Sequence, residues 1–458
     1  KLPKNVDWRR LMKISKEDIV LWKNADKVLI LNRETGSWFV GEDQYNDIEK
    51  CLNGEITLEK AKDCKLVEKL INENILFTDK GKSIIEKPYV DQLGLLILDT
   101  TNRCNLACKY CFVNATDSGV MMSLETALKA LRAVLDSSKC ADVLTIEFSG
   151  GEPLLNFSMI EQFIPKANKM AEKKKKKLTF SIQTNATLLN EHIMTFLIEN
   201  KVNVGVSIDG EKEYHDKNRV FSDGIGSLDV ITKNIKEFKN KGGQVSVLAV
   251  ISSVQQYESV IKYAIENGIE SIRTNLVTKI GRAEEKKEFD LEYMELADKF
   301  IEVSDKMICG EIKLHDVTLS HFLWNLVQVQ PHMCFRVPCG SGRNQISITA
   351  SGEMYTCQEW RNIHDAPIGN VNVDTDLDMK LIENKRAREL ANRDVNKSEV
   401  CKKCDWKTFC GICPREIYSE NNDILGKIPH CDFQNKVFEK LAWKFYKHSE
   451  DIKKYLLS

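Results

Sequence analysis

The sequence predicts an α/β fold built around a partial parallel barrel. Between residues 93 and 276, short apolar runs alternate with segments whose apolar residues recur at helical spacing, such as Leu124–Leu135 and Glu191–Glu199. The intervals are long enough for right-handed crossovers, so the strands are expected to be parallel. Six strand–helix units fall short of the eight that close a full barrel, which leaves one side open. The expected strands are Leu93–Leu98, Val143–Phe148, Leu178–Ile182, Val202–Ser207, Val245–Ile251 and Glu270–Leu276.

Residues 27–77 predict a small unit ahead of the barrel. The apolar runs Val28–Leu31 and Ser37–Val40 flank a turn-forming segment at residues 32–36, which is typical of a β-hairpin. Helical spacing follows, with a stop at Asn53–Gly54, so three helices are expected between residues 45 and 77. A DNA-reading winged helix has this order of elements, but the unit carries at least as many acidic as basic residues and no basic stripe.

Composition excludes several classes of protein. The 458 residues are enough for two or three domains. A net charge of −1 with 29% charged residues gives no indication of a nucleic-acid or anionic-membrane partner. No apolar stretch approaches the ~20 residues of a membrane span. No signal peptide is recognised, so a cytoplasmic location is expected.

Cysteine content points to metal binding. Fifteen cysteines without a secretion signal favour metal ligands over disulfides, and most of them fall in three groups, at residues 104–111, 334–357 and 401–431. The four that stand apart are expected to be ordinary small apolar residues: Cys51, Cys64, Cys140 and Cys309.

The first group has the spacing C-x3-C-x2-C, with ligands Cys104, Cys108 and Cys111. Three thiolates can hold three irons of a [4Fe–4S] cluster and leave the fourth iron open to a small molecule. The loop follows the first expected strand, at the carboxyl end where α/β barrels carry their chemistry. Zinc is the alternative, but structural zinc sites usually have four ligands in paired C-x2-C units.

This triplet, followed by Gly-Gly-Glu-Pro at residues 150–153, strongly resembles the radical S-adenosylmethionine (SAM) enzymes. The resemblance implies that the open iron binds SAM and that one-electron reduction yields a 5′-deoxyadenosyl radical. Ser207 and Arg219 match the positions that bind the SAM carboxylate, and Arg has the donor geometry for it. Asn185 matches a residue that contacts the ribose or carboxylate, although Ala186 stands where the family has glycine. The full set of implied SAM-site residues is Phe112, near the adenine, with Gly150, Gly151, Glu152, Asn185, Ser207 and Arg219.

The C-terminal cysteines resemble the SPASM domain, which carries two auxiliary [4Fe–4S] clusters. The resemblance implies one cluster on Cys401, Cys404, Cys410 and Cys431. The other would use Cys339, Cys357 and Cys413, with Cys334 as the fourth ligand or with one iron left open. The spacing Cys410-x2-Cys413 departs from the usual three intervening residues. With the barrel cluster, three [4Fe–4S] clusters and SAM are the expected cofactors.

The N-terminal unit resembles the PqqD-like peptide-recognition domain of ribosomal-peptide maturation systems. The expected domains are therefore residues 1–90 (PqqD-like), 91–310 (radical SAM barrel) and 311–458 (SPASM). This combination implies a maturase of a ribosomally made precursor peptide, bound through its leader and reduced by a flavodoxin or ferredoxin. Thioether formation of the sactipeptide or ranthipeptide type is expected. Carbon–carbon crosslinking and anaerobic sulfatase-maturase-like oxidation of Cys or Ser remain alternatives, and the catalytic base is not identified.

Overall fold

The computed structural model describes residues 18–34, 36–42, 49–50, 92–284, 286–327, 339–361, 363, 366–374, 376–411 and 413–457. Apart from residues 49–50, the helices expected between residues 45 and 77 lie outside this set, as do Cys51, Cys64 and Cys334.

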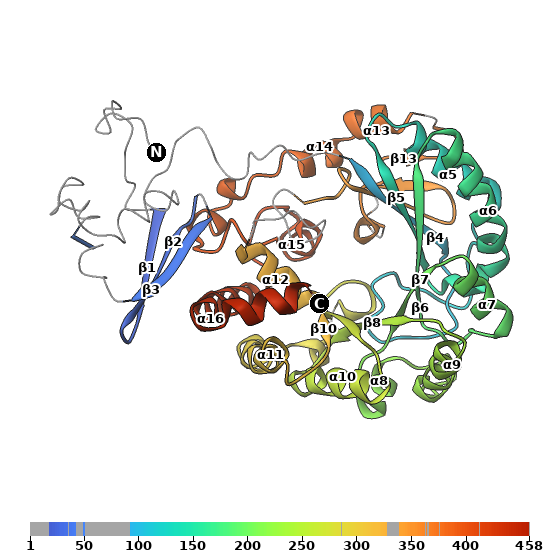
Figure 1. Cartoon of the computed structure of the whole chain (residues 1–458). Coiled ribbons are helices and arrows are strands. Elements are labelled where there is room, and N and C mark those ends of the chain that lie inside the picture. The colour runs from blue at the N-terminus through green and yellow to red at the C-terminus, as the bar shows by residue number, and fades with distance from the viewer. Residues whose placement is uncertain are drawn as a thin grey trace.

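The described residues contain one large sheet whose centre is parallel (Figure 1). Strands β4 to β9 pair in sequence order and in parallel, which confirms the six predicted strands. Strand β10 adds to β9 in parallel, and β11 adds to β4 in parallel, so the C-terminal third extends the same sheet. The strands are β4 (Leu93–Thr101), β5 (Cys140–Gly150), β6 (Lys177–Thr184), β7 (Asn203–Ser207), β8 (Val245–Ile251), β9 (Ser271–Leu276), β10 (His315–Asp316), β11 (Gln345–Ile348), β12 (Glu353–Tyr355) and β13 (Gly369–Asn370).

Amphipathic helices cover the outer face of the barrel strands (Figure 1). Caps define where they begin: the side chain of Ser123 accepts from the Thr126 N–H, and that of Asn190 accepts from the Ile193 N–H. Phe148 of β5 packs edge-on against Phe163 of the following helix, with ring centroids 5.8 Å apart, and this contact holds the helix against the outer face of the sheet. The helices are α5 (Leu124–Asp136), α6 (Phe157–Lys173), α7 (Glu191–Glu199), α8 (Lys212–Asn218), α9 (Leu228–Asn240), α10 (Val254–Glu266), α11 (Tyr293–Ile308) and α12 (Val317–Val327).

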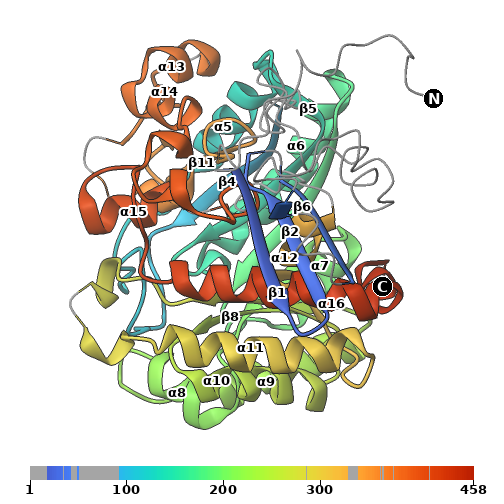
Figure 2. The ribbon, with the colours of Figure 1, turned by 90° about the vertical axis from the view of Figure 1, so that its left-hand side faces the viewer.

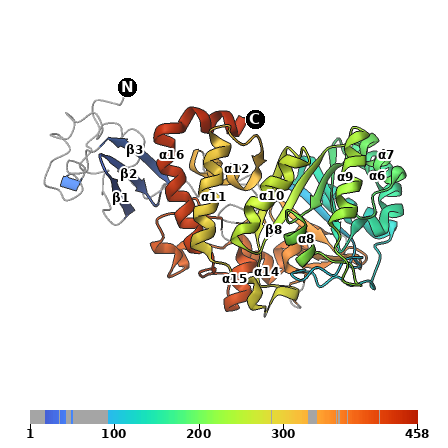
Figure 3. The ribbon, with the colours of Figure 1, turned by 90° about the horizontal axis from the view of Figure 1, so that it is seen from below.

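The long C-terminal helix joins the barrel to the rest of the chain. Helix α16 (Cys431–Leu457) packs on α11 and α12 through an aromatic cluster, in which the Phe322 and Phe438 rings lie 4.9 Å apart. The shorter helices α13 (Leu377–Glu383), α14 (Lys385–Ala391) and α15 (Pro414–Asn421) precede it. Figure 3 shows α16 between the barrel and the N-terminal strands.

The N-terminal unit contributes a small antiparallel sheet, in the order β1 (Ile19–Asn24), β2 (Lys27–Asn32), β3 (Ser37–Glu42). The predicted hairpin is confirmed as β2–β3, and β1 is an additional strand that the sequence analysis missed. The sheet lies in front of α16 in Figure 2. None of the helices in the described part of the chain combines the length and apolar character of a bilayer-spanning helix.

Candidate active site and cluster-binding cysteines

The cysteine loop leaves the carboxyl end of β4 and brings Cys104, Cys108 and Cys111 within electrostatic range of one another. Burial raises the pKa of the Cys104 thiol to about 12 and that of Cys108 to about 11. Because thiols bind metal as thiolates, cluster assembly must release these protons. The three half-buried cysteines thus lie together on the loop that follows β4.

Arg282 holds the shape of this loop, and the sequence analysis did not identify it. Its side chain donates to the carbonyl oxygens of Cys108 (2.7 Å) and Ala115 (2.7 Å), and its backbone N–H donates to the Cys111 carbonyl (3.0 Å). Gly281 precedes it with φ of 62°, and a Cβ there would lie 2.5 Å from the Cys111 oxygen. The loop is therefore fixed from a segment about 170 residues away in sequence, with no recognisable motif.

The glycine pair contacts the cysteine loop itself. The Gly151 N–H donates to the Thr101 carbonyl and the Glu152 N–H to the Arg103 carbonyl, both at 2.8 Å. A Cβ on Gly150 would stand 2.2 Å from the Thr101 oxygen, and one on Gly151 would stand 2.0 Å from the Arg103 oxygen. Glycine is thus required so that the end of β5 can lie directly against the backbone that leads to Cys104.

Gly151→Ala is therefore expected to displace the cysteine loop, because the obstacle is backbone that cannot rotate away. We expect a loss of about 1–3 kcal/mol in stability together with lower iron content after anaerobic reconstitution. Gly94→Ala is the matched control, since a Cβ at Gly94 meets nothing within 4 Å. Wild-type iron content in Gly151→Ala would show that this close approach is unimportant.

Glu152 joins the ends of β5 and β6. Its buried carboxylate accepts hydrogen bonds from the Leu154 N–H (3.0 Å), the Thr184 hydroxyl (2.6 Å) and the Asn185 N–H (2.7 Å). Burial raises its pKa to about 7, while these donors lower it. The Glu152 carboxylate is within electrostatic range of Cys104, and both of its oxygens already accept hydrogen bonds from the protein. Glu152 therefore supports the structure around the cysteine loop.

Asn185 lies directly against the cysteine loop. Its amide nitrogen donates to the Asn105 side chain at 2.9 Å and is 3.9 Å from the Cys104 sulfur. The next residue, Ala186, has a left-handed backbone with φ of 59°, a conformation that glycine adopts without strain. This explains in physical terms why a glycine would suit that position.

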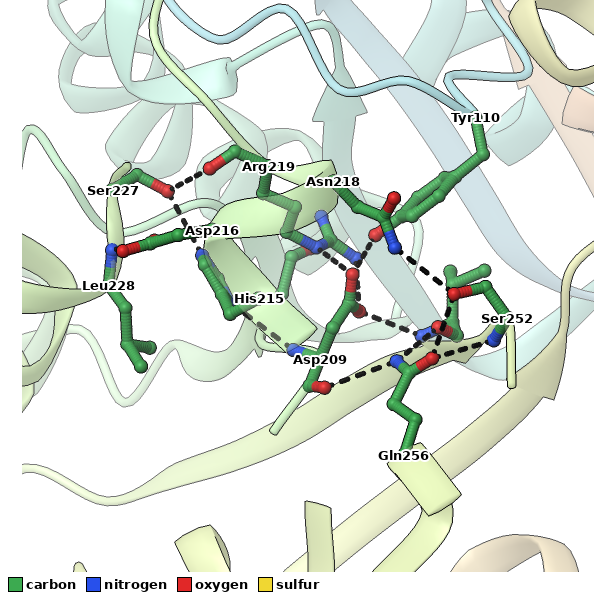
Figure 4. Close-up of polar contacts among 12 residues, drawn as sticks. Tyr110, Asp209, His215, Asp216, Asn218, Arg219, Ser227, Leu228, Ser252 and Gln256 are labelled. Carbon is green, nitrogen blue, oxygen red and sulfur yellow. Dashed lines mark hydrogen bonds and ion pairs between the residues drawn. The ribbon is translucent and has the colours of Figure 1, made fainter. Parts of the chain in front are cut away.

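Arg219 is paired inside the protein (Figure 4). Its Nε and Nη2 atoms donate to the two oxygens of Asp209 at 3.0 and 3.1 Å, and both side chains are buried. The guanidinium also lies over the ring of Tyr110, which sits between Cys108 and Cys111 and hydrogen-bonds Asp209. Burial lowers the pKa of Arg219, but the neighbouring Asp209, Tyr110 and Cys108 together outweigh it, so the pKa of Arg219 stands above its usual value. A SAM carboxylate would therefore meet the remaining N–H groups of a cation already fixed by Asp209.

Other predicted residues surround the same mouth. Ser207, at the end of β7, accepts from the Gln183 amide at 3.0 Å. His215 and Asp216 are local structural partners: His215 contacts Ser227 at 2.9 Å, and Asp216 accepts a hydrogen bond from the Leu228 N–H.

Phe112 follows Cys111, and the guanidinium of Arg361 lies 5.3 Å from its ring. Arg361 belongs to the C-terminal third, only four residues after Cys357.

The C-terminal cysteines form two neighbouring sets. Cys401, Cys404, Cys410 and Cys431 all line one cavity of about 890 Å³. Cys413 instead lies within electrostatic range of Cys339. Cys357 stands half-buried before the turn at Gln358–Trp360, and Cys334 lies outside the described residues. Of the isolated cysteines, Cys140 is buried and Cys309 exposed.

The donor chemistry of these residues fits iron–sulfur clusters. The three barrel cysteines and the four cysteines that line the C-terminal cavity supply thiols in the numbers that a [4Fe–4S] cluster binds, three of them leaving one iron open. In such a cluster each thiolate binds a different iron, so the sulfurs stand apart by the width of the cluster.

Comparisons with known proteins agree with this geometry. The family model of the radical SAM superfamily matches residues 98–253, and that of the SPASM iron–sulfur cluster-binding domain matches residues 339–405. A cysteine-type anaerobic sulfatase-maturating enzyme of Clostridium perfringens is 26% identical over 369 residues, covering 76% of this chain and 95% of that protein.

Two solved structures share the fold. The enzyme anSMEcpe with bound AdoMet has a TM-score of 0.68 at 23% identity, covering 80% of this chain and 98% of that one. Streptococcus suis SuiB bound to precursor peptide SuiA has a TM-score of 0.57 at 17% identity, covering 92% and 99%. On the sequence matches, the chain is a radical SAM enzyme with a SPASM domain, related to the anaerobic sulfatase-maturating enzymes.

Proposed function

We propose that this chain matures a ribosomally synthesised precursor peptide by joining a cysteine sulfur to a carbon of another residue. The observation that carries this proposal is an N-terminal sheet attached to the cysteine-rich C-terminal third. We assign residues 1–90 to peptide recognition, 91–310 to the radical SAM barrel and 311–458 to the SPASM domain. A flavodoxin or ferredoxin is the proposed electron donor.

The attachment is specific. Trp22 of β1 stacks on Trp406 with centroids 5.5 Å apart and planes 9° from parallel. Arg33 pairs with Asp405 at 3.2 Å and donates to the Lys403 carbonyl at 3.3 Å. Glu34 pairs with Lys407. Residues 403–407 include Cys404, so a peptide held by the sheet would be delivered beside the cysteine-rich region.

Among the described residues, the outer edge of β3 has no partner strand. Strand β2 is paired on both sides, by β1 and by β3, so the hairpin edge that remains is that of β3. Open sheet edges bind extended peptides through main-chain hydrogen bonds. SuiB, whose structure holds a precursor peptide, matches 92% of this chain, whereas anSMEcpe matches 80% while being almost wholly covered itself. This difference supports peptide maturation, since the anSMEcpe fold accounts for less of the chain than the SuiB fold does.

The site residues have these proposed roles. Cys104, Cys108 and Cys111 hold a cluster. The cluster and bound SAM together would supply a 5′-deoxyadenosyl radical. Ser207 and Arg219 orient the SAM carboxylate, Asn185 its ribose or carboxylate, and Phe112 the adenine. Gly150, Gly151 and Glu152 keep the loop in place. Two auxiliary clusters are proposed on Cys401, Cys404, Cys410 and Cys431, and on Cys339, Cys357, Cys413 and Cys334.

Oxidation of a Cys or Ser residue is the second candidate. The 26% identity to a cysteine-type anaerobic sulfatase-maturating enzyme favours it, and anSMEcpe has been solved with bound AdoMet and the Cp18Cys peptide. Such a reaction does not account for the N-terminal sheet. Carbon–carbon crosslinking shares the proposed architecture and differs only in the bond that forms.

The test is to search beside the gene for short cysteine-containing open reading frames, to co-express the enzyme with each peptide found, and to record tandem mass spectra. Thioether formation predicts a product lighter by two hydrogens per bond, with the cysteine no longer alkylated by iodoacetamide. A peptide with free thiols and a new carbon–carbon link, or a hydrazine-trapped aldehyde from cysteine, would replace the thioether proposal with one of its rivals.

Deleting the residues before Leu93 is expected to weaken leader binding about tenfold or more, a loss of ~1.4 kcal/mol or greater. The reason is that the proposed strand-addition edge is removed while the barrel pocket remains. Binding can be measured by fluorescence anisotropy of a labelled leader. Iron content and peptide-independent SAM cleavage are the controls, and both should survive. Equal leader affinity with and without the unit would refute its assignment.

A further inference from the structure

Every reaction proposed above must dispose of a proton. Joining S–H to C–H, or oxidising a cysteine, removes two hydrogens from the substrate. One leaves as a hydrogen atom to the 5′-deoxyadenosyl radical, and the other must leave as a proton with one electron. Among the predicted SAM-site residues the only carboxylate is Glu152, and its oxygens already accept three hydrogen bonds. The base for that proton is therefore expected elsewhere in the barrel interior.

Glu147 projects into that interior. On β5, Leu144, Ile146 and Phe148 are fully buried against the helices, so by strand alternation Glu147 faces the opposite side. Its strand neighbours are Ile97 of β4 and Ser181 of β6. It stands three residues before the glycine pair that supports the cysteine loop.

The charges around Glu147 come from both sides of the barrel and from the C-terminal third. Its carboxylate is within electrostatic range of Arg273, Asp99 and Arg361. Arg273 lies on β9, and three strands separate β9 from β5 in the sheet, so this interaction crosses the barrel. Arg361 contacts Asp99 and lies over Phe112 beside the cluster loop. Glu147 thus faces a group of charged side chains that links the barrel interior to the cluster loop.

Neighbouring carboxylates are already engaged. Asp99 is ion-paired with Arg361, Asp209 binds Arg219 through both oxygens, and Glu152 accepts three hydrogen bonds. By contrast, within the described part of the chain no donor hydrogen-bonds the Glu147 carboxylate and no cation lies within 4.0 Å of it. Glu359 has no such partner in the same residues either, and it is also within electrostatic range of Arg361 and Arg273. It lies within range of Cys413 and only two residues after Cys357, however, so it belongs with the auxiliary cysteines.

We propose that Glu147 is the proton acceptor for the peptide substrate. The carboxylate takes the substrate proton while the C–H hydrogen atom goes to the adenosyl radical and an iron–sulfur oxidant takes the remaining electron. The S–H and C–H bonds break, and the S–C bond forms. This inference rests on the proposed function, but it requires only that the substrate be oxidised by two electrons.

The electrostatics of Glu147 suit this task. Burial raises the pKa of its carboxyl group, and Arg273 and Arg361 only partly offset the effect, while Asp99 adds to it. A base with a raised pKa accepts a proton more readily near neutral pH. Glu147 is half-buried and its carboxylate has no contact partner among the described residues, so Glu147→Gln should raise the melting temperature or leave it unchanged. A residue kept at such a cost to stability is a candidate for function.

The experiment compares Glu147→Gln and Glu147→Asp with two controls, Glu359→Gln and the exposed Glu125→Gln on α5. The first measurement needs no peptide: an infrared pH titration of wild type against Glu147→Gln. We expect a carboxyl signal that titrates above the ordinary glutamate range and is missing in the variant. The second uses the full-length peptide encoded beside the gene.

With that peptide, Glu147→Gln should still form 5′-deoxyadenosine within about twofold of wild type but lose about 100-fold or more in crosslinked product. Glu147→Asp should recover part of it, and wild-type product should fall as pH drops through the raised pKa of Glu147. Full product formation by Glu147→Gln, or product lost only in Glu359→Gln, would overturn the proposal. If wild type leaves the peptide unmodified, the proposed function fails. The infrared titration then decides for Glu147 by itself: a signal that titrates above the ordinary glutamate range and is missing in Glu147→Gln supports the proposal, and no such signal overturns it.

Discussion

Replacing Cys104, Cys108 and Cys111 together by Ala is expected to abolish reductive cleavage of SAM. The three thiols lie within electrostatic range of one another on one loop, and a cluster cannot be retained there without them. The fall in 5′-deoxyadenosine formation should exceed the ~100-fold that loss of an outer partner of a metal site can cause. The measurement is anaerobic turnover with dithionite and SAM, followed by chromatography of the nucleosides.

Cys309→Ala is the matched control, because Cys309 is exposed at the end of α11 and outside every cysteine group. It should retain full activity and iron content. Undiminished 5′-deoxyadenosine formation in the triple variant would show that SAM is cleaved elsewhere, and the assignment of the barrel site would then be wrong.

Asp209→Ala is expected to destabilise the barrel by about 3–5 kcal/mol, because removal of one member of a buried ion pair leaves the other charge uncompensated. Arg219 is 8% exposed and Asp209 0% exposed in their side chains, so water cannot replace the lost partner. The Tyr110 hydroxyl and the Val250 N–H lose an acceptor as well. Urea unfolding of the variant should show a lower midpoint, and cluster retention should fall with it.

Asp229→Ala removes one member of an exposed pair, with Lys212, and should change stability by less than about 1 kcal/mol. If Asp209→Ala were no more destabilising than Asp229→Ala, the Asp209–Arg219 pair would not contribute the stability expected of a buried ion pair.

The strands and the cysteine groups were predictable because they depend on local patterns. Val245–Ile251 forms β8 with the predicted bounds, since an apolar run between polar turns has few other solutions. Strand β1 was missed because its sequence, Ile-Val-Leu-Trp-Lys-Asn, is short and lacks the alternation that marks a half-buried strand. The glycine pair was recognised, but the contact that requires glycine is with the cysteine-loop backbone.

Long-range partners could not be predicted. Arg282 clamps the cysteine loop from about 170 residues away, and Arg361 reaches Asp99 and Phe112 from the C-terminal third. Glu147 and Arg273 meet across the barrel, which only the closed geometry of the sheet reveals. No spacing motif records such pairs, since they depend on how separate strands and loops are placed in space.

Transfer of deuterium tests the central claim most directly, namely that this enzyme generates a radical that takes hydrogen from a peptide. The peptide encoded beside the gene, labelled with deuterium at carbon, is incubated anaerobically with enzyme, SAM and reductant, and the mass of 5′-deoxyadenosine is recorded. The account predicts 5′-deoxyadenosine that carries one deuterium, in proportion to modified peptide. Modified peptide accompanied only by unlabelled 5′-deoxyadenosine would contradict it.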